Sequence, residues 1–364
     1  MSTKRNSVLN LSSPFFALKH VIVFLSLIIL NVWFYRILVD FHKTQEDDRT
    51  ERHVTMLDIP NITTTLAPCL LRDLEILESM GSRDARLMLS PPVQVLLSPR
   101  TNGTDFKPLI VIMITSMAES ILQRQEVRRT WMQWTKRFRV QALFFLGLDE
   151  DAPNFQDIYS DLVHEQQVYG DLVVIKFQEG YYRLTAKTLR MLEWFLQFYK
   201  GTEDRPKFLV KTDHDVFVNV PNLLRHMYSS ETWTSMRQNG YYFGGHIIKK
   251  AGVNLNATTK WFVSPDYWYP ARKFYPHFLS GPFYIMSSNI LEKLFNGSFT
   301  VPLYPFEDVY LTGMLRQKVN LKLTQVDNLQ LLSVPNMEEL RNMIAGHSIF
   351  SLTSFQQYWV HFTH

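Results

Sequence analysis

One cysteine, Cys69, is present among the 364 residues, and this scarcity excludes two kinds of architecture. No intrachain disulfide can form, and no zinc site can be built from several cysteines. The charge excess is small as well, because 38 lysines and arginines face 34 acidic residues and leave a net charge of +4. Such a balance gives no electrostatic reason to expect a nucleic-acid partner.

The chain does contain ample apolar material, since 46% of its residues are hydrophobic. This composition excludes a disordered or collagen-like polymer and is sufficient for a sizeable core. The length fits one large α/β domain or two small ones behind an amino-terminal extension. Whether Cys69 joins this chain to another, in a homodimer or heterodimer, stays open.

The amino-terminal part carries a membrane signal. Residues 21–35 are almost entirely apolar, and after Arg36 the run continues to residue 39, which is roughly the length needed to cross a bilayer. We expect a signal-anchor helix at 21–39 behind a cytosolic tail at 1–20. The alternative is a cleaved signal peptide, although no small-x-small cleavage site follows the run.

The orientation of this anchor is not decided by lysine and arginine counts, which are nearly equal on its two sides. Four acceptor triplets for N-glycosylation follow it, at Asn61, Asn102, Asn256 and Asn296. They favour a lumenal body, and therefore a single-pass type II protein of the secretory pathway. We expect a stem at 40–105 and a catalytic body at 106–364.

The body alternates strand-like and helix-like stretches. Continuous apolar runs at 109–114, 140–146, 171–175 and 207–212 predict buried strands. Stretches at 120–134, 155–168 and 184–199 have helical spacing between them. This order predicts βαβ units and an α/β fold with a mostly parallel central sheet.

Two acids follow the fourth strand directly. In an extended segment Asp213 and Asp215 point the same way, at the carboxyl end of a strand, where open α/β sheets bind ligands. Paired carboxylates suit Mg²⁺ or Mn²⁺ held together with substrate phosphates. The alternative is an Asx-turn in which both acids are merely solvated.

Two further pairs carry possible chemistry. Arg124 and Arg128 are four apart and share one helix face, which suits diphosphate recognition or else forms a solvated basic face. Glu307 and Asp308 open a late helix. There they act either as a general base or as favourably placed acids in a first helical turn.

These segments together resemble the inverting β-1,3-glycosyltransferases (glycosyltransferase family 31), the family that contains β-1,3-galactosyl- and β-1,3-N-acetylglucosaminyltransferases. The resemblance spans roughly residues 108–360 in the family's order. The matching blocks are Arg124, Arg128, Thr130 and Trp131; 144–147; Glu165 with 169–171; Phe177, Tyr181, 184–185 and 187–188; 211–219; Lys260, Trp261 and Ser264; 275–276; 280–281; 307–310; 345–347; and 358–359.

The chain departs from the family pattern at several positions. His214 replaces the middle acid of the usual triplet, and 282–283 read Pro-Phe where a glycine-rich turn is common. Leu279 stands where a cysteine is frequent, and Lys176 where many members have Asp. These changes concern the donor sugar and the acceptor more than the fold.

The resemblance implies a GT-A-like nucleotide-sugar-binding fold, a UDP-sugar donor and a divalent ion, Mn²⁺ or Mg²⁺. It implies Asp215 as the first metal ligand and His347 as a second, although by itself a lone histidine such as His347 is more often an ordinary surface or core residue. Asp213 would reach the ribose or a metal-bound water. Arg124, Arg128 and Lys187 would grip the nucleotide.

On the acceptor side, the resemblance implies that Asp308 removes the proton of an acceptor hydroxyl, while Glu307 orients either Asp308 or the acceptor. Trp261 and Trp268 either stack on the acceptor, an oligosaccharide on a glycoprotein or glycolipid, or are ordinary core or surface aromatic residues. The implied product is a β-1,3 linkage formed with inversion. The implied location is the Golgi membrane, with the catalytic domain in the lumen.

Two other interpretations remain at this point. The first is a catalytically inactive, membrane-anchored homologue that acts as a lectin-like or chaperone-like protein. The second treats the paired carboxylates as a glycoside hydrolase site, which predicts metal-independent activity. The donated sugar stays open among galactose, N-acetylgalactosamine and N-acetylglucosamine.

Overall fold

A computed structural model describes residues 68–100, 107–201, 205–256, 258–263, 273–331, 337–347 and 352–363. The expected tail and anchor, Asn61, Asn102 and Trp268 lie outside these residues. Within the described ranges, no helix is both long enough and apolar enough to span a membrane. All of them belong to one contact unit, Thr63–His364.

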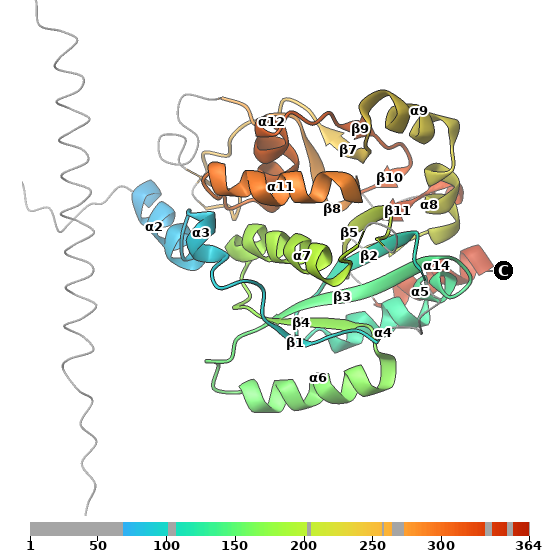
Figure 1. Cartoon of the computed structure of the whole chain (residues 1–364), viewed down its shortest axis with the longest axis horizontal. Coiled ribbons are helices and arrows are strands. Elements are labelled where there is room, and N and C mark those ends of the chain that lie inside the picture. Colours follow the sequence, from blue (N-terminus) through green and yellow to red (C-terminus); the bar gives the residue numbers. More distant parts are fainter. Residues whose placement is uncertain are drawn as a thin grey trace, which may run out of the picture. The chain divides into compact units, whose positions relative to one another are not determined.

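The centre of the fold is an eight-stranded mixed sheet in the order β1-β4-β3-β2-β5-β8-β7-β9 (Figure 1). Strands β4, β3, β2 and β5 run parallel and confirm the four predicted strands. Beyond β5 the sheet is antiparallel at β8 and β7, which the sequence did not predict. The strands are β1 (Val95–Leu97), β2 (Ile110–Thr115), β3 (Val140–Leu148), β4 (Leu172–Lys176), β5 (Phe208–Asp213), β7 (Phe243–Ile248), β8 (Phe278–Ser287) and β9 (Thr324–Gln325).

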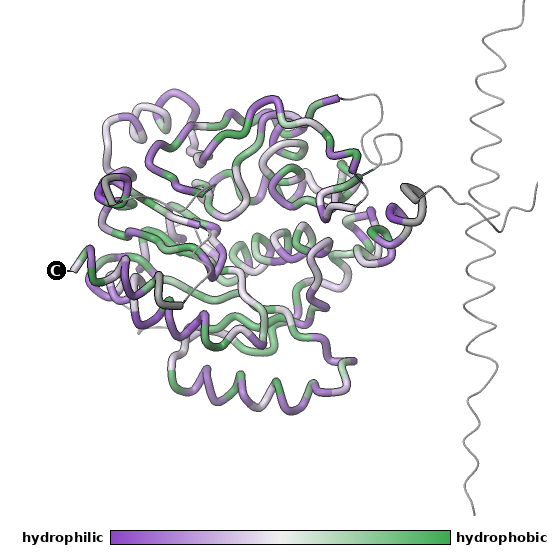
Figure 2. The backbone as a smooth tube through the Cα atoms, turned by 180° about the vertical axis from the view of Figure 1, so that it is seen from behind, coloured by the Kyte–Doolittle hydropathy of each residue, from purple (hydrophilic) through white to green (hydrophobic). Residues whose placement is uncertain are grey.

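The composition of β2 shows why the parallel half was predictable. Successive side chains of a strand point to opposite faces of the sheet. Val111 and Met113 accordingly join one core cluster, whereas Ile110, Ile112 and Ile114 join the other. A strand buried on both faces needs a continuous apolar run. Figure 2 shows this hydrophobic character along the central strands.

Helices cover both faces of the sheet. Apolar residues of α7 and α11 belong to the core cluster of Val111, while those of α4, α6, α8 and α14 belong to the other cluster. The longer helices are α4 (Ile121–Arg129), α6 (Phe155–Tyr169), α7 (Leu184–Phe198), α8 (Val220–Met227), α9 (Ser230–Asn239), α11 (Leu291–Gly297), α13 (Met337–Asn342) and α14 (Leu352–Thr363). Shorter ones are α5 (Met132–Thr135), α12 (Arg316–Lys318), η1 (Tyr181–Arg183), η2 (Ser288–Ile290), η3 (Ser298–Thr300) and the π-helix η4 (Val309–Leu315).

The expected stem at 40–105 extends too far, because residues 68–100 are part of the folded body. Helices α2 (Pro68–Met80) and α3 (Ala85–Met88) place Ile76, Met80 and Ala85 in the same core cluster as α7. Strand β1 pairs antiparallel with β4 at the edge of the sheet. The polar composition hid this packing, because only every third or fourth residue of α2 faces the core.

A second, three-stranded sheet ties the carboxyl-terminal region to the end of β5. It contains β10 (Leu329–Gln330), β11 (Ala345–Gly346) and β6 (Phe217–Val218). In the antiparallel pair, Gly346 lies opposite Phe217 and Ala345 opposite Val218. This register places the residue after β11 beside the residues that precede β6.

Candidate active site

The carboxyl ends of β2 and β5 lie level with each other, because Thr115 is paired with Asp213. The Thr115 hydroxyl donates a hydrogen bond to the Asp213 carboxylate, and Lys211 Nζ lies 2.7 Å from Asp213 Oδ1. The Asp213 side chain is about one-third exposed. This carboxylate therefore belongs to the sheet edge and is already held by two donors.

Asp215 lies in a different local environment from Asp213. The strand ends at Asp213, and a turn carries the chain through His214 and Asp215. The expected same-side alternation along a strand therefore does not apply. Asp215 Oδ2 instead lies 3.4 Å from His347 Nε2, across the β6–β11 pairing.

The contact between Asp215 and His347 unites two residues predicted as metal ligands. His347 Nδ1 lies 3.1 Å from the Leu331 carbonyl oxygen, so Nδ1 carries the hydrogen and Nε2 faces Asp215. Burial works against charge on both groups, yet their contact raises the pKa of His347 and lowers that of Asp215.

A carboxylate oxygen and a neutral imidazole nitrogen fixed by a carbonyl are suitable ligands for a divalent ion. Across the described residues, no group of three or more His, Cys, Asp or Glu side chains forms a metal site. A cation here would therefore have two protein ligands, and substrate oxygens or water would have to complete its shell.

A second cluster lies around Lys211 and is more deeply buried. Its Nζ donates to the Gly281 carbonyl at 2.8 Å, in addition to Asp213, and lies 4.0 Å from Glu307 Oε2. Glu307 accepts a hydrogen bond of 2.6 Å from the Tyr284 hydroxyl. One ammonium thus links the acid at the end of β5 to the acids before the π-helix.

Asp308 precedes the π-helix and is held by main-chain donors. Its Oδ1 accepts from the Val309 N–H at 2.8 Å, and its Oδ2 accepts from the Gly281 N–H at 3.2 Å. A Cβ added at Gly281 would lie 3.2 Å from this Oδ2. The glycine therefore leaves room for the carboxylate in its present position.

Both acids of this cluster have raised pKa values. Burial raises the pKa of Glu307 to about 7, with the Asp308 charge adding to it and Lys211 opposing it. Burial also raises the pKa of Asp308, against the effect of the Val309 N–H and Lys211. A carboxylate of raised basicity inside a site is the form suited to accept a proton from a hydroxyl group.

The raised pKa of Glu307 predicts a pH dependence of stability. The folded protein retains the Glu307 proton to about pH 7, whereas the unfolded chain releases it near 4.5. Stability should therefore fall as pH rises between these values, by at most about 1.4 kcal/mol per pH unit. Chemical denaturation of the wild type and of Glu307→Gln at several pH values measures this difference.

The neighbouring groups Lys211, Asp213, Tyr284 and Asp308 are common to both proteins in that comparison. Where the titration of these groups does not depend on Glu307, it contributes equally to both free energies of unfolding and cancels when one is subtracted from the other. A difference between the two free energies of unfolding that stays constant from pH 4.5 to 7 would contradict the raised pKa.

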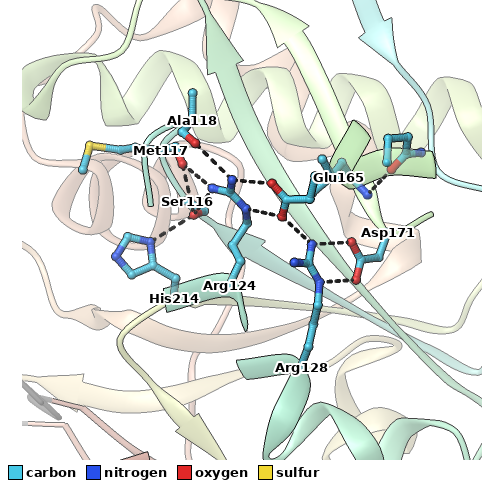
Figure 3. A network of polar contacts seen from close by, with 10 residues as sticks. Ser116, Met117, Ala118, Arg124, Arg128, Glu165, Asp171 and His214 are labelled. Carbon is cyan, nitrogen blue, oxygen red and sulfur yellow. Dashed lines mark hydrogen bonds and ion pairs between the residues drawn. The ribbon is translucent and has the colours of Figure 1, made fainter. Parts of the chain in front are cut away.

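Arg124 and Arg128 form neither an open phosphate clamp nor a solvated basic face (Figure 3). Both side chains are buried, and both pair with Glu165, at 2.6 and 2.7 Å. Arg128 also makes a bidentate pair with Asp171, at 2.8 and 2.7 Å. Carboxylates and the carbonyls of Met117 and Ala118 take most of their donors, and Arg128 Nη1 is buried without a hydrogen-bond partner among the described residues. This pairing argues against the expected direct contact of the two guanidinium groups with the nucleotide.

Lys187 is buried too. Its Nζ donates to Glu179 Oε1 and, at 2.7 Å, to the Ser116 carbonyl. Burial lowers its pKa, although Glu179 opposes the shift. Glu179 also lines a cavity of about 320 Å³, whose other lining residues are Glu75, Glu78, Ser79, Gln178 and Arg183. None of the residues with an expected catalytic or metal role lines this cavity.

Trp261, an expected acceptor residue, is 53% exposed. Lys260 Nζ lies 5.0 Å from the centre of its ring and 5.2 Å from that of Tyr181. Burial, and after it the charge of Asp308, raise the pKa of Tyr181 to about 12. The rings of Trp261 and Tyr181 thus both lie within cation–π distance of the Lys260 ammonium group.

Several residues of the site were not assigned a role from the sequence. Lys211, Tyr284 and Glu179 hold the acids and the buried lysine, and Glu165 and Asp171 neutralise the arginines. A signal existed for Lys211, since a lysine inside a buried strand, two positions before Asp213, shares the face of that acid. The other four depend on contacts between distant segments.

The two expected glycosylation sites that are described are both exposed. Asn256 Oδ1 accepts hydrogen bonds from the N–H and the hydroxyl of Thr258, at 3.0 and 2.8 Å. Asn296 lies in α11, and the hydroxyl of Ser298 donates to the Phe295 carbonyl at 2.6 Å. The hydroxyl of the triplet thus bonds the acceptor asparagine only at Asn256.

An α/β sheet in which the parallel strand β5 ends at an aspartate, beside an Asp–His pair and two acids of raised pKa, defines an α/β protein equipped for polar group-transfer chemistry. A family model described as "Galactosyltransferase" matches residues 122–327. This is more than half of the chain. The chain belongs to the galactosyltransferase family.

Curated relatives agree with this assignment. Beta-1,3-galactosyltransferase 5 of Pan paniscus is 29% identical over 230 residues, which cover 63% of this chain and 71% of that protein. Beta-1,3-galactosyltransferase 1 of Homo sapiens is 32% identical over 213 residues, which cover 58% of this chain and 60% of that protein.

Solved structures align only weakly. A glycosyltransferase involved in the glycosylation of the major capsid of PBCV-1 has a TM-score of 0.36 at 11% identity, covering 70% of this chain and 100% of that one. A mannosyltransferase of Pyrobaculum calidifontis in complex with GDP-Man and Mn²⁺ has a TM-score of 0.33 at 10% identity, covering 74% and 70%. Scores this low carry no argument about the site.

Proposed function

We propose that this protein is a UDP-sugar-dependent β-1,3-glycosyltransferase that uses a divalent ion, Mn²⁺ or Mg²⁺. It would move galactose or an N-acetylhexosamine to a hydroxyl of a glycan acceptor, with inversion. The observation that carries the proposal is the Asp308 carboxylate, whose pKa is raised by burial and which accepts the Gly281 N–H, while Lys211 joins the Gly281 carbonyl to Asp213 at the sheet edge. The family and its β-1,3-galactosyltransferase relatives support it.

On the donor side, Asp215 and His347 would hold the cation, because they offer an oxygen and a nitrogen ligand in contact. The bound ion would supply Lewis acidity and neutralise the charge of the departing diphosphate. The Asp213 side chain, which is about one-third exposed, would face the ribose or a water molecule bound to the ion.

On the acceptor side, Asp308 would accept the proton of the attacking hydroxyl at its carboxylate. Attack from the face opposite the leaving group inverts the anomeric centre, so a base is needed on the acceptor side. Glu307, held by Tyr284, would orient the hydroxyl. Trp261 would stack on the acceptor sugar, and the same role for Trp268 stays a proposal outside the described residues.

The cellular setting is part of the proposal. We infer a single-pass type II protein of the Golgi membrane, with tail, anchor and lumenal body as the sequence predicts. The partners would be the UDP-sugar, a glycoprotein or glycolipid glycan and the bilayer, without nucleic acid. Exposure of Asn256 and Asn296 supports their modification in the lumen.

An inactive, lectin-like or chaperone-like homologue is the second candidate, and the departures at 282–283 and at His214 are the features that would favour it. Phe283, however, is fully buried in the core and lies opposite Thr212 in the sheet. The Pro282 carbonyl accepts a hydrogen bond from the Thr212 hydroxyl. This phenylalanine therefore fills the core rather than a sugar site, and the active enzyme is favoured.

A panel of UDP-sugars tests the proposal. The purified lumenal body would be incubated with each sugar nucleotide and a set of glycan acceptors, with and without Mn²⁺. We expect UDP release that requires acceptor and metal, and a β-1,3-linked product by NMR. Absence of UDP binding and of release with every donor would leave only the inactive homologue.

A further inference from the structure

The loop between β2 and α4 is held from inside the domain by two buried cations. Lys187 Nζ donates to the Ser116 carbonyl at 2.7 Å. Arg124 donates to the carbonyls of the next two residues, Met117 at 2.5 Å and Ala118 at 3.0 Å. Figure 3 shows the guanidinium of Arg124 directed at this loop. Three consecutive carbonyl groups are thus turned toward the interior.

The direction of these carbonyls fixes the direction of the N–H groups. In a planar trans peptide the C=O and N–H bonds point opposite ways. The N–H groups of Met117, Ala118 and Glu119 therefore point away from the buried cations. In the part of the chain that the structure describes, none of the three N–H groups has an acceptor. The loop presents a row of donors on its outer side.

This loop borders the proposed donor site. The His214 N–H donates to the Thr115 carbonyl at 3.2 Å, and His214 Nδ1 lies 3.2 Å from the Ser116 hydroxyl oxygen. Asp213 is bonded to Thr115. The loop and the turn that contains Asp215 consequently form one hydrogen-bonded edge. A shift of the loop would therefore change the contacts available to a nucleotide bound at this edge.

We propose that Lys187 and Arg124 are positioning residues: they fix the Ser116–Ala118 segment from the interior, so that nucleotide binding depends on two cations that do not contact it. The inference rests on the proposed function, which places the nucleotide at this edge. The outward donors would take oxygen acceptors of the nucleotide, either on the base or on the diphosphate.

Helix α7 supplies a matched control for the test. Arg190 lies in the same helix as Lys187, and both side chains are buried, with exposures of 7% and 2%. Like Lys187, Arg190 pairs with a carboxylate, Glu193 at 2.8 Å, and donates to main-chain carbonyls, those of Met88 and Leu89. Those carbonyls belong to α3 and to the residue after it, and neither is part of the proposed site.

The experiment compares Lys187→Met with Arg190→Met. Both should lower the melting temperature, because each leaves a carboxylate, the partly exposed Glu179 or the buried Glu193, without its cation. Only Lys187→Met should weaken binding of UDP in the presence of Mn²⁺, by about tenfold, the equivalent of one hydrogen bond to a charged group. Arg190→Met should stay within about twofold of the wild type. Titration calorimetry with UDP, uridine and pyrophosphate shows which half of the nucleotide loses affinity.

Arg124→Lys gives a second variant in case Lys187→Met does not fold, since it keeps the charge beside Glu165 but loses the fork that reaches both carbonyls. Amide exchange gives a readout that needs no nucleotide. The Ser116 and Ser120 N–H groups are bonded to the carbonyls of Phe145 and Met117. Their exchange should accelerate in Lys187→Met and Arg124→Lys but not in Arg190→Met.

The outcomes separate the inference from the function on which it rests. Unchanged UDP affinity and unchanged exchange of the Ser116 amide in Lys187→Met would overturn the positioning role. If the wild type itself does not bind UDP, the proposed function fails, while the exchange rates still decide whether the two cations hold the loop.

Discussion

Asp308→Asn is expected to lower the rate of transfer by about 10²–10⁴-fold, the usual contribution of a general base. The substitution keeps the size of the side chain and an oxygen that can accept the N–H of Val309 or of Gly281. It removes the group that would take the hydroxyl proton. UDP binding should be unchanged, because Asp308 belongs to the acceptor side of the site. Steady-state kinetics and calorimetry with UDP measure the two quantities separately.

The control for this variant is an acid whose only expected role is favourable placement in a first helical turn. Asp157 in α6 is such a residue, and it is exposed. Asp157→Asn should change stability by less than about 1 kcal/mol and leave turnover as it was. Normal turnover in Asp308→Asn would remove Asp308 from the role of base and would favour the plain capping role that the sequence also permits.

The parallel half of the sheet could be predicted from the sequence because its strands are buried on both faces. β2 is a continuous apolar run, and each of its residues belongs to one core or the other. β8 gave a weaker signal, since Ser280, Gly281 and Pro282 interrupt it at the site itself. Gly281, which leaves room for Asp308, is thus one of the residues that obscure the strand.

The arginines show a limit of a different kind. Spacing of four residues correctly places Arg124 and Arg128 on one face of α4, but spacing does not show what that face meets. Their partner Glu165 lies about 40 residues away in α6, and only the packing of α6 decides that the face is buried. Residue type and pattern were predictable here, whereas burial and therefore role were not.

The Asp215–His347 contact depends on two-residue strands, which have no detectable period in the sequence. β6 and β11 are each two residues long, yet their register carries His347 across the fold to the end of β5. Residue-level reasoning alone found Asp215 at a strand end and left His347 an ordinary histidine. The family resemblance suggested the pairing, and the geometry now gives it a physical cause.

Asp215→Ala is the prediction with the largest expected effect on nucleotide binding, because it removes one of two protein ligands for the proposed cation. Mn²⁺-dependent affinity for UDP should be lost, as a single imidazole holds a hard divalent ion poorly when phosphate oxygens are its other ligands. The fold should remain, since the Asp215 side chain is 41% exposed and its ion pair is with His347.

Calorimetric titration of UDP with and without Mn²⁺ checks this expectation, and the Thr324→Ala variant on the edge strand β9 is a control remote from the pair. His347→Ala should give the same loss if the two residues act as one site. Retention of the metal-dependent affinity in both variants would place the cation elsewhere, and Asp213 would then be the remaining carboxylate at this edge. Loss in Asp215→Ala alone would instead limit His347 to orienting Asp215, because an imidazole that only fixes a ligand contributes less than the ligand itself.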